Sequence, residues 1–315
     1  MIKFKKRYLL YIGVILILIS LIIAPKYTFE AATEGLLLWS NVIVPSLLPF
    51  IIVSNLIIQF NIVRYISIIF NPIMKYVYKL PGVAGYAWVL GMLSGYPMGA
   101  KIVADLLNKN LITQKQAQYL LTFSNNASPM FVLGFVSVGI LDVGNLGIYL
   151  LIILYISSLL TGVIFSFVYR IDTKNINNTK KYTLVKSNET AFKIFDQCII
   201  DGVDLIVRIG GYVIFFSIIL SLVNLIPIDS LLIKNFLLGT VEISNGISLL
   251  SKIPNGIETK IVLVNTIIAF GGFSVHAQTA SVIQNTNLSI TKYVLAKCVN
   301  AFITFLLTLL FFIFI

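Results

Sequence analysis

The sequence is poor in charged residues, in cysteine and in histidine. Only 11% of its 315 residues are charged and 58% are hydrophobic, whereas a typical soluble domain has about 25% charged and about 45–50% apolar residues. This composition excludes a soluble enzyme, and it also excludes a disordered chain. The apolar residues form runs long enough to cross a bilayer as helices, which need about 20 residues each. We therefore predict an all-α polytopic membrane protein.

The scarcity of metal-binding side chains limits the chemistry further. One histidine and two separated cysteines cannot build a typical zinc site, so we expect no metal and no cofactor. His276 would form a hydrolase triad with Ser274 and Glu242 only with a nucleophile-elbow spacing, which is missing. The glycines before Lys101 do not match a phosphate-binding P-loop. We therefore expect no enzymatic activity.

The net charge of +11 also has to be explained. A nucleic-acid surface would interleave basic with aromatic residues, and no such stretch occurs, so we expect no nucleic-acid partner. Instead, lysine and arginine collect in short hydrophilic stretches, which in membrane proteins lie in the cytoplasm. The basic N-terminus and the basic stretch 170–193 are therefore predicted to be cytoplasmic. The C-terminus is predicted on the opposite side of the membrane.

The hydrophilic stretch in the middle of the chain predicts a division into two halves. We predict an N-terminal anchor helix in residues 1–30 and a first gate-type repeat in 31–169. A basic cytoplasmic linker follows in 170–196, and a second, inverted gate-type repeat occupies 197–315. An uncleaved anchor is favoured over a signal peptide because Pro25 stands where cleavage would be expected.

The two halves repeat one pattern of a long span, a glycine-broken segment and a span interrupted by polar residues. Gly91 precedes Phe123 by 32 residues, and Gly239 precedes Phe270 by 31. If the glycine-broken segments are re-entrant hairpins, the halves are inverted relative to each other. Inverted repeats with broken helices are typical of secondary transporters, whose binding site lies at the repeat interface. We therefore predict a transporter-like inverted repeat.

The broken segments supply the candidate substrate-binding residues. Irregular backbone at membrane depth must be buried in protein or line a cavity, and the helix N-termini at such breaks suit anions. The candidates are Ser94, Gly95, Tyr96, Pro97, Gly99 and Lys101; Ser124, Asn125, Asn126 and Ser128; Glu242 and Asn245; and Gly271, Gly272, Ser274, His276 and Gln278. Close helix crossing between small residues is the alternative explanation. For His276, a structural role and a binding role both stay open.

Charged residues inside apolar segments are costly and need a role. Lys101 lies four residues before Asp105, so it can pair with that carboxylate or contact a substrate anion. Asp204 and Arg208 have the same spacing, and we expect a structural ion pair. Glu242 has no basic neighbour in the sequence, so we interpret it as a candidate for ion coupling or for a polar substrate contact.

The segments 94–105, 123–129 and 271–278 together resemble the YlbJ-type sporulation integral membrane proteins, also called stage V sporulation protein V. The resemblance covers nearly the whole chain from about Ala31, although the chain looks shorter at the linker and the C-terminus. This family belongs with the nucleoside-recognition or gate-domain proteins, which are distantly similar to concentrative nucleoside transporters.

The resemblance implies a function in endospore-forming bacteria. It implies a multi-pass protein of the bacterial cell membrane, in the outer forespore membrane of the mother cell, that moves dipicolinic acid and is needed for spore cortex formation. Lys101 and His276 would contact the carboxylates of this planar dianion, and Tyr96 or Phe273 would stack on its ring. A nucleoside carrier and a non-transporting membrane scaffold stay open as alternatives. The expected partners are a small anionic solute and the lipid bilayer, and a homo-oligomer stays open.

Overall fold

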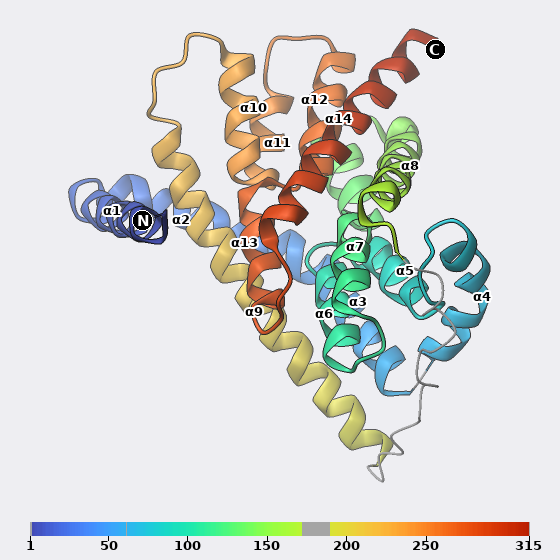
Figure 1. Ribbon diagram of the computed structural model, residues 1–315. Helices are drawn as coiled ribbons and strands as arrows, with labels where there is room; N and C mark the ends of the chain where they lie inside the picture. The colour runs from blue at the N-terminus through green and yellow to red at the C-terminus, as the bar shows by residue number, and fades with distance from the viewer. Residues whose placement is uncertain (1, 61, 172–189, 315) are drawn as a thin grey trace.

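The computed structural model describes residues 2–60, 62–171 and 190–314 (Figure 1). The described residues form helices and no strand. Four stretches are long and apolar enough to cross a membrane. They are α8 (Gly144–Tyr169), α9 (Ala191–Val223), the stretch Ile257–Ile283, which contains a break at Gly271, and α14 (Ile290–Phe314). The prediction of an all-α polytopic membrane protein is confirmed.

The N-terminal residues form two helices that meet at Pro25. α1 (Ile2–Ile23) ends before Pro25, where α2 (Pro25–Leu38) begins at an angle of 108°. Proline is well suited to the first position of a helix because its missing N–H has no partner there in any case. The predicted boundary at residue 30 therefore lies inside α2. The division into domains itself stays a prediction.

A rod of three consecutive elements packs along α9. α2 continues into a π-helical turn, η1 (Trp39–Ile43), and then into α3 (Val44–Gln59). The indole Nε1 of Trp39 donates to the carbonyl of Ile206 on α9 at 2.9 Å. α9 begins at Ala191, inside the predicted linker 170–196, and most of that linker lies outside the described residues.

The rest of the first half contains a helical hairpin and a broken span. α4 (Val63–Tyr76) precedes α5 (Ala84–Ser94) and α6 (Met98–Asn108), which pack against each other. α7 (Gln114–Ser124) and η2 (Met130–Ile140) follow, and the four residues 125–128 between them have no helical structure. α7 starts with a capping box in which Thr113 and Gln116 bind each other's backbone N–H groups.

The second half has the same order of elements. α10 (Leu231–Val241) and α11 (Ile243–Ser251) form its hairpin. α12 (Ile257–Phe270) and α13 (Gly272–Ile283) form its broken span, and α14 corresponds to α8. The hairpin glycines are equivalent too, since Gly99 and Gly246 lie 147 positions apart. A Cβ on Gly99 would overlap the carbonyl of Ser124, and a Cβ on Gly246 would overlap the backbone of Gly239.

The two hairpins enter from opposite ends of the bundle. Gln118 on α7 exchanges two hydrogen bonds with the backbone of Ser289, and Lys115 donates to the carbonyl of Arg170. The α6–α7 turn, the α13–α14 turn and the end of α8 therefore share one end, which we call the linker end. The α10–α11 hairpin opens at the other end, where the C-terminus lies (Figure 1). The breaks in the predicted segments are present, and the relation of the two halves as an inverted repeat stays a prediction.

Candidate functional site

A buried lysine lies where the broken helices meet. Lys297 on α14 has 0% of its surface exposed, and its Nζ donates to the side-chain oxygen of Asn126 at 3.3 Å. Within the described part of the chain, no carboxylate forms an ion pair with this lysine. Burial of a charge without a partner of opposite charge is costly. Lys297 therefore needs either a structural reason or a ligand.

Two aromatic rings flank the ammonium group of Lys297. Its Nζ lies 5.2 Å from the ring centroid of Tyr96 and 5.9 Å from that of Tyr293. These distances allow cation–π attraction, which offsets part of the desolvation cost. The hydroxyl of Tyr96 donates to the carbonyl of Ile268 at 2.9 Å and so fixes its ring across the two halves.

The break between α7 and η2 is held by two asparagines. Asn125 donates to the hydroxyls of Tyr293 at 2.8 Å and Thr279 at 3.1 Å, and it accepts from the backbone N–H of Ala100. Asn126 donates to the carbonyl of Phe123 at 2.9 Å. These bonds satisfy polar groups that the break frees, so both amides have a structural role. The oxygen of Asn126 still faces Lys297.

His276 on α13 is buried beside the same centre. Only 5% of its surface is exposed, and neither ring nitrogen has a hydrogen-bond partner among the described residues. The rings of Phe270 and Tyr293 contact it edge-on, with centroids 4.7 and 5.5 Å away. The hydroxyl of Ser124 is likewise buried without a partner. Buried polar atoms without partners are rare and destabilising, so a ligand or water is expected to satisfy them.

Glu242 separates α10 from α11 and is buried. The sequence offers it no basic neighbour, and the structure supplies a helix N-terminus instead. Its carboxylate accepts from the backbone N–H of Asn245 at 2.8 Å and so caps α11. The side chain of Asn245 donates to Ser217 on α9 at 2.9 Å. A coupling role for Glu242 stays a prediction.

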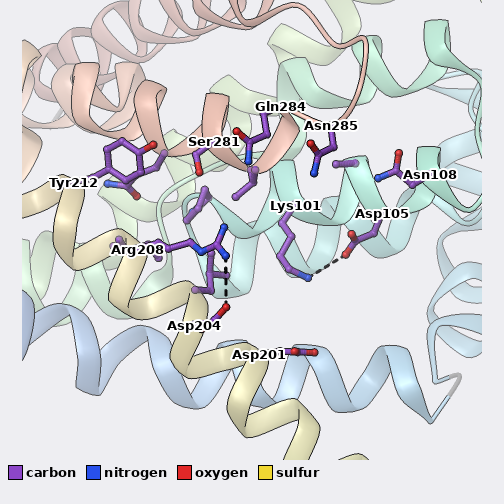
Figure 2. A pocket seen from close by; sticks show the side chains of 16 residues that line it. Lys101, Asp105, Asn108, Asp201, Asp204, Arg208, Tyr212, Ser281, Gln284 and Asn285 are labelled. Carbon is purple, nitrogen blue, oxygen red and sulfur yellow. Dashed lines mark hydrogen bonds and ion pairs between the residues drawn. The ribbon is translucent and has the colours of Figure 1, made fainter.

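Lys101 lies away from Lys297, at the linker end. It pairs with Asp105 at 3.1 Å, and both line a cavity of 390 Å³ whose opposite wall belongs to α9 (Figure 2). Arg208 and Asp204 pair on that wall at 3.5 Å. The predicted ion pair of Asp204 with Arg208 is therefore present, and the pairing with Asp105, one of the two alternatives for Lys101, is present as well. His276 is not among the residues that line this cavity, so the structure does not bring Lys101 and His276 together there.

The remaining candidates surround a small central cavity or shape the breaks. Gly95, Tyr96, Ser128, Glu242 and Gln278 line a cavity of 60 Å³. The side chain of Gln278 also donates to the hydroxyl of Ser274 at 3.3 Å. Ser94 is the last residue of α5, and Pro97 immediately precedes α6. Gly271 and Gly272, at the α12–α13 break, have φ of +90° and +69°, a conformation that favours glycine. Whether these residues contact a substrate stays a prediction.

One aromatic candidate points elsewhere, and one functional candidate was missed. Phe273 is 51% exposed on the bundle surface, so Tyr96 is the ring that lies in the centre. Lys297 lies in a strongly apolar segment whose composition predicts only a membrane span. The sequence feature that could have identified it is the helical spacing of Lys297, Asn300 and Thr304, which places these three polar residues on one face. All three are buried.

The chain is similar to one curated relative, the "Sporulation integral membrane protein YlbJ" of Bacillus subtilis (strain 168). The two are 32% identical over 304 residues, which cover 87% of this chain and 74% of the relative. No protein-family model matches the chain, and no solved structure matches it significantly. The identity and coverage agree with the motifs in the broken segments, and the chain belongs to the YlbJ family of sporulation integral membrane proteins.

Proposed function

We propose that this protein carries a small organic anion across a membrane of a sporulating cell, and that Lys297 is its central contact with the solute. The observation that supports the proposal is the burial of Lys297 between two helix breaks without a carboxylate partner. Ionisable residues inside membrane proteins commonly mark substrate or ion pathways, because they are otherwise too costly. A bound anion would supply the missing charge.

Neighbouring groups support an anionic solute. His276 and Ser124 contribute buried polar atoms without partners among the described residues, and a carboxylate can accept a hydrogen bond from either side chain. α13 begins at Gly272, so the N–H groups of its first turn lie at the α12–α13 break. A carboxylate solute would satisfy these donors together with Lys297.

Dipicolinic acid is the solute we propose, carried across the outer forespore membrane of the mother cell for cortex formation. Membership of a family of sporulation integral membrane proteins supports a role in spore formation. Dipicolinate is a small planar dianion, so its ring can stack on Tyr96 while its carboxylates contact Lys297 and His276. Tyr96 already lies beside the lysine, which supports this geometry.

A nucleoside carrier is the second candidate. The lining of the 60 Å³ cavity favours it, since Ser128, Glu242 and Gln278 offer hydrogen bonds to a neutral polar solute. A non-transporting scaffold is the third candidate, and it leaves the buried Lys297 without a role.

Uptake into proteoliposomes containing the purified protein tests the proposal. We expect uptake of radiolabelled dipicolinate, with competition by dicarboxylates and not by nucleosides. Lys297→Leu is expected to lower uptake by at least about tenfold, since loss of a buried charge partner weakens binding strongly. Lys292→Leu removes an exposed lysine from the same helix and is expected to leave uptake unchanged.

The possible outcomes separate the three candidates. Parental uptake by Lys297→Leu would remove this residue from the site. Competition by nucleosides alone would support the nucleoside carrier. Failure of the parent protein to take up either solute would support the scaffold.

A further inference from the structure

Three cavities in the described residues follow one another from end to end of the bundle. The cavity of 390 Å³ at the linker end and the central cavity of 60 Å³ share Ile209 and Gln278 as lining residues. The central cavity and a third cavity of 610 Å³ share Ser244. Because neighbouring cavities share their walls, they lie in series.

α9 borders all three cavities in the order of its sequence. Asp204 and Arg208 line the cavity at the linker end, Val213 lines the central one, and Ser221 and Asn224 line the third. Both ends of this wall are polar. Its middle is apolar, since only Ile209 and Val213 of α9 reach the central cavity.

The central cavity is a constriction. Its 60 Å³ lies far below the roughly 300–1,000 Å³ of typical small-molecule sites, whereas the outer cavities of 390 and 610 Å³ fall within that range. A narrow point between two wider cavities blocks the passage of a solute until it widens. Tyr96 borders this constriction and also lies beside Lys297, so the narrowest point adjoins the proposed anion contact.

The hydrogen bonds show along which seam the constriction can widen. α9 is tied to the α2–η1–α3 rod, because Trp39, Tyr27 and Asn55 of that rod donate to its carbonyls. Within the described residues, no hydrogen bond joins the 205–213 stretch of α9 to α6 or α13. Separation of α9 from these two helices would therefore break apolar contacts and no hydrogen bond at this level.

We propose that the carried anion passes along α9 through these three cavities, and that Ile209 and Val213 form the closed gate of the route. The inference rests on the proposed function, because it needs a transported solute. The lining of the gate also includes Tyr96, at the α5–α6 break, and Gln278 on α13, and both are positioned to contact the solute as it passes. If the three cavities were not connected, transport would not depend on the side chain at Val213.

Chemical blocking of the gate tests the route. Val213→Cys is introduced into a protein in which Cys198 and Cys298 are replaced by alanine, and a membrane-permeant benzyl methanethiosulfonate adds bulk at the new thiol. Val207→Cys is the matched control, because Val207 lies on the same helix but is 54% exposed, whereas Val213 is 2% exposed. Mass spectrometry measures the extent of labelling, and dipicolinate uptake is measured before and after it.

We expect labelling of Val213→Cys to lower dipicolinate uptake by at least about tenfold, as filling a narrow route removes the binding space, and labelling of Val207→Cys to leave uptake unchanged. Unchanged uptake by fully labelled Val213→Cys would overturn the route while the proposed function stands. Failure of Val213→Cys to react during active uptake would also overturn it. Absence of uptake before labelling, in the parent as well, would overturn the proposed function and the route with it.

Discussion

Thr304 on α14 donates to the hydroxyl of Ser157 on α8 at 2.6 Å, and the two residues occupy equivalent positions in the two halves. They lie 147 positions apart, as Gly99 and Gly246 do. If the halves are related by the predicted inverted repeat, this bond lies close to the axis that relates them. The same offset matches Lys297 with Leu150, which is buried and apolar. α8 therefore has a buried leucine at the position where α14 has Lys297. The fold of this helix pair does not require a lysine there.

This asymmetry predicts that Lys297→Leu stabilises the protein or leaves its stability unchanged. Replacement of buried charged groups by well-packed apolar ones is often neutral or stabilising by about 1–4 kcal/mol. Thermal unfolding of the purified protein in detergent measures the change, with Lys292→Leu as the control. A marked loss of stability in Lys297→Leu alone would show that the bond to Asn126 holds the fold together.

Substitution of the hairpin glycines by alanine is expected to disturb the close packing of the hairpins. Gly99→Ala is expected to destabilise the protein by about 1–3 kcal/mol, the usual cost of overpacking, because its Cβ would overlap the carbonyl of Ser124. Gly246→Ala should behave in the same way in the second half. Gly211→Ala is the control, since its Cβ would meet nothing within 4 Å. Equal unfolding temperatures for Gly99→Ala and Gly211→Ala would contradict the close approach.

Hydropathy and glycine spacing are sufficient to predict the helices and the places where they break, because these features depend on local composition and on the positions of glycine. The position of Lys297 in the centre depends instead on which face of α14 meets the break at Asn126, a contact between residues 171 positions apart. A single lysine in a strongly apolar helix does not reveal that partner. Its spacing with Asn300 and Thr304 is the signal that predicts a polar face.

The directions of side chains in the broken segments are equally hard to predict. Helical periodicity assigns residues to faces only while the helix continues, and the helical backbone is interrupted at Gly95 and at Gly271, which have φ of +82° and +90°. Tyr96 and Phe273 therefore look equivalent in the sequence, yet the first lies in the centre and the second on the surface. The cap that Glu242 forms on α11 depends on a helix start that the apolar segment around it does not mark.

Two substitutions of Glu242 distinguish its role as a helix cap from any role of its charge. Glu242→Ala removes the acceptor for the N–H of Asn245, so we expect a loss of about 0.5–2 kcal/mol. Glu242→Gln keeps an acceptor oxygen and should lose less. Unfolding measurements on both variants test the cap, and uptake by Glu242→Gln tests ion coupling. Equal destabilisation by both variants would contradict the cap, because the cap needs an oxygen and not a charge.

His276 gives the sharpest distinction between a structural and a binding role. Its ring nitrogens have no partners among the described residues, so His276→Phe removes buried polar atoms and keeps the edge-on contacts with Phe270 and Tyr293. Removing an unsatisfied polar group without leaving another can be neutral or stabilising, and we expect unfolding temperatures at or above that of the parent.

Dipicolinate uptake by His276→Phe is expected to fall, because the ring no longer offers a hydrogen bond to a carboxylate. Ser289→Ala, a change far from this centre at the α13–α14 turn, serves as the uptake control. If His276→Phe lowers stability and leaves uptake at the parental rate, the histidine is a structural residue whose partners form only in another conformation.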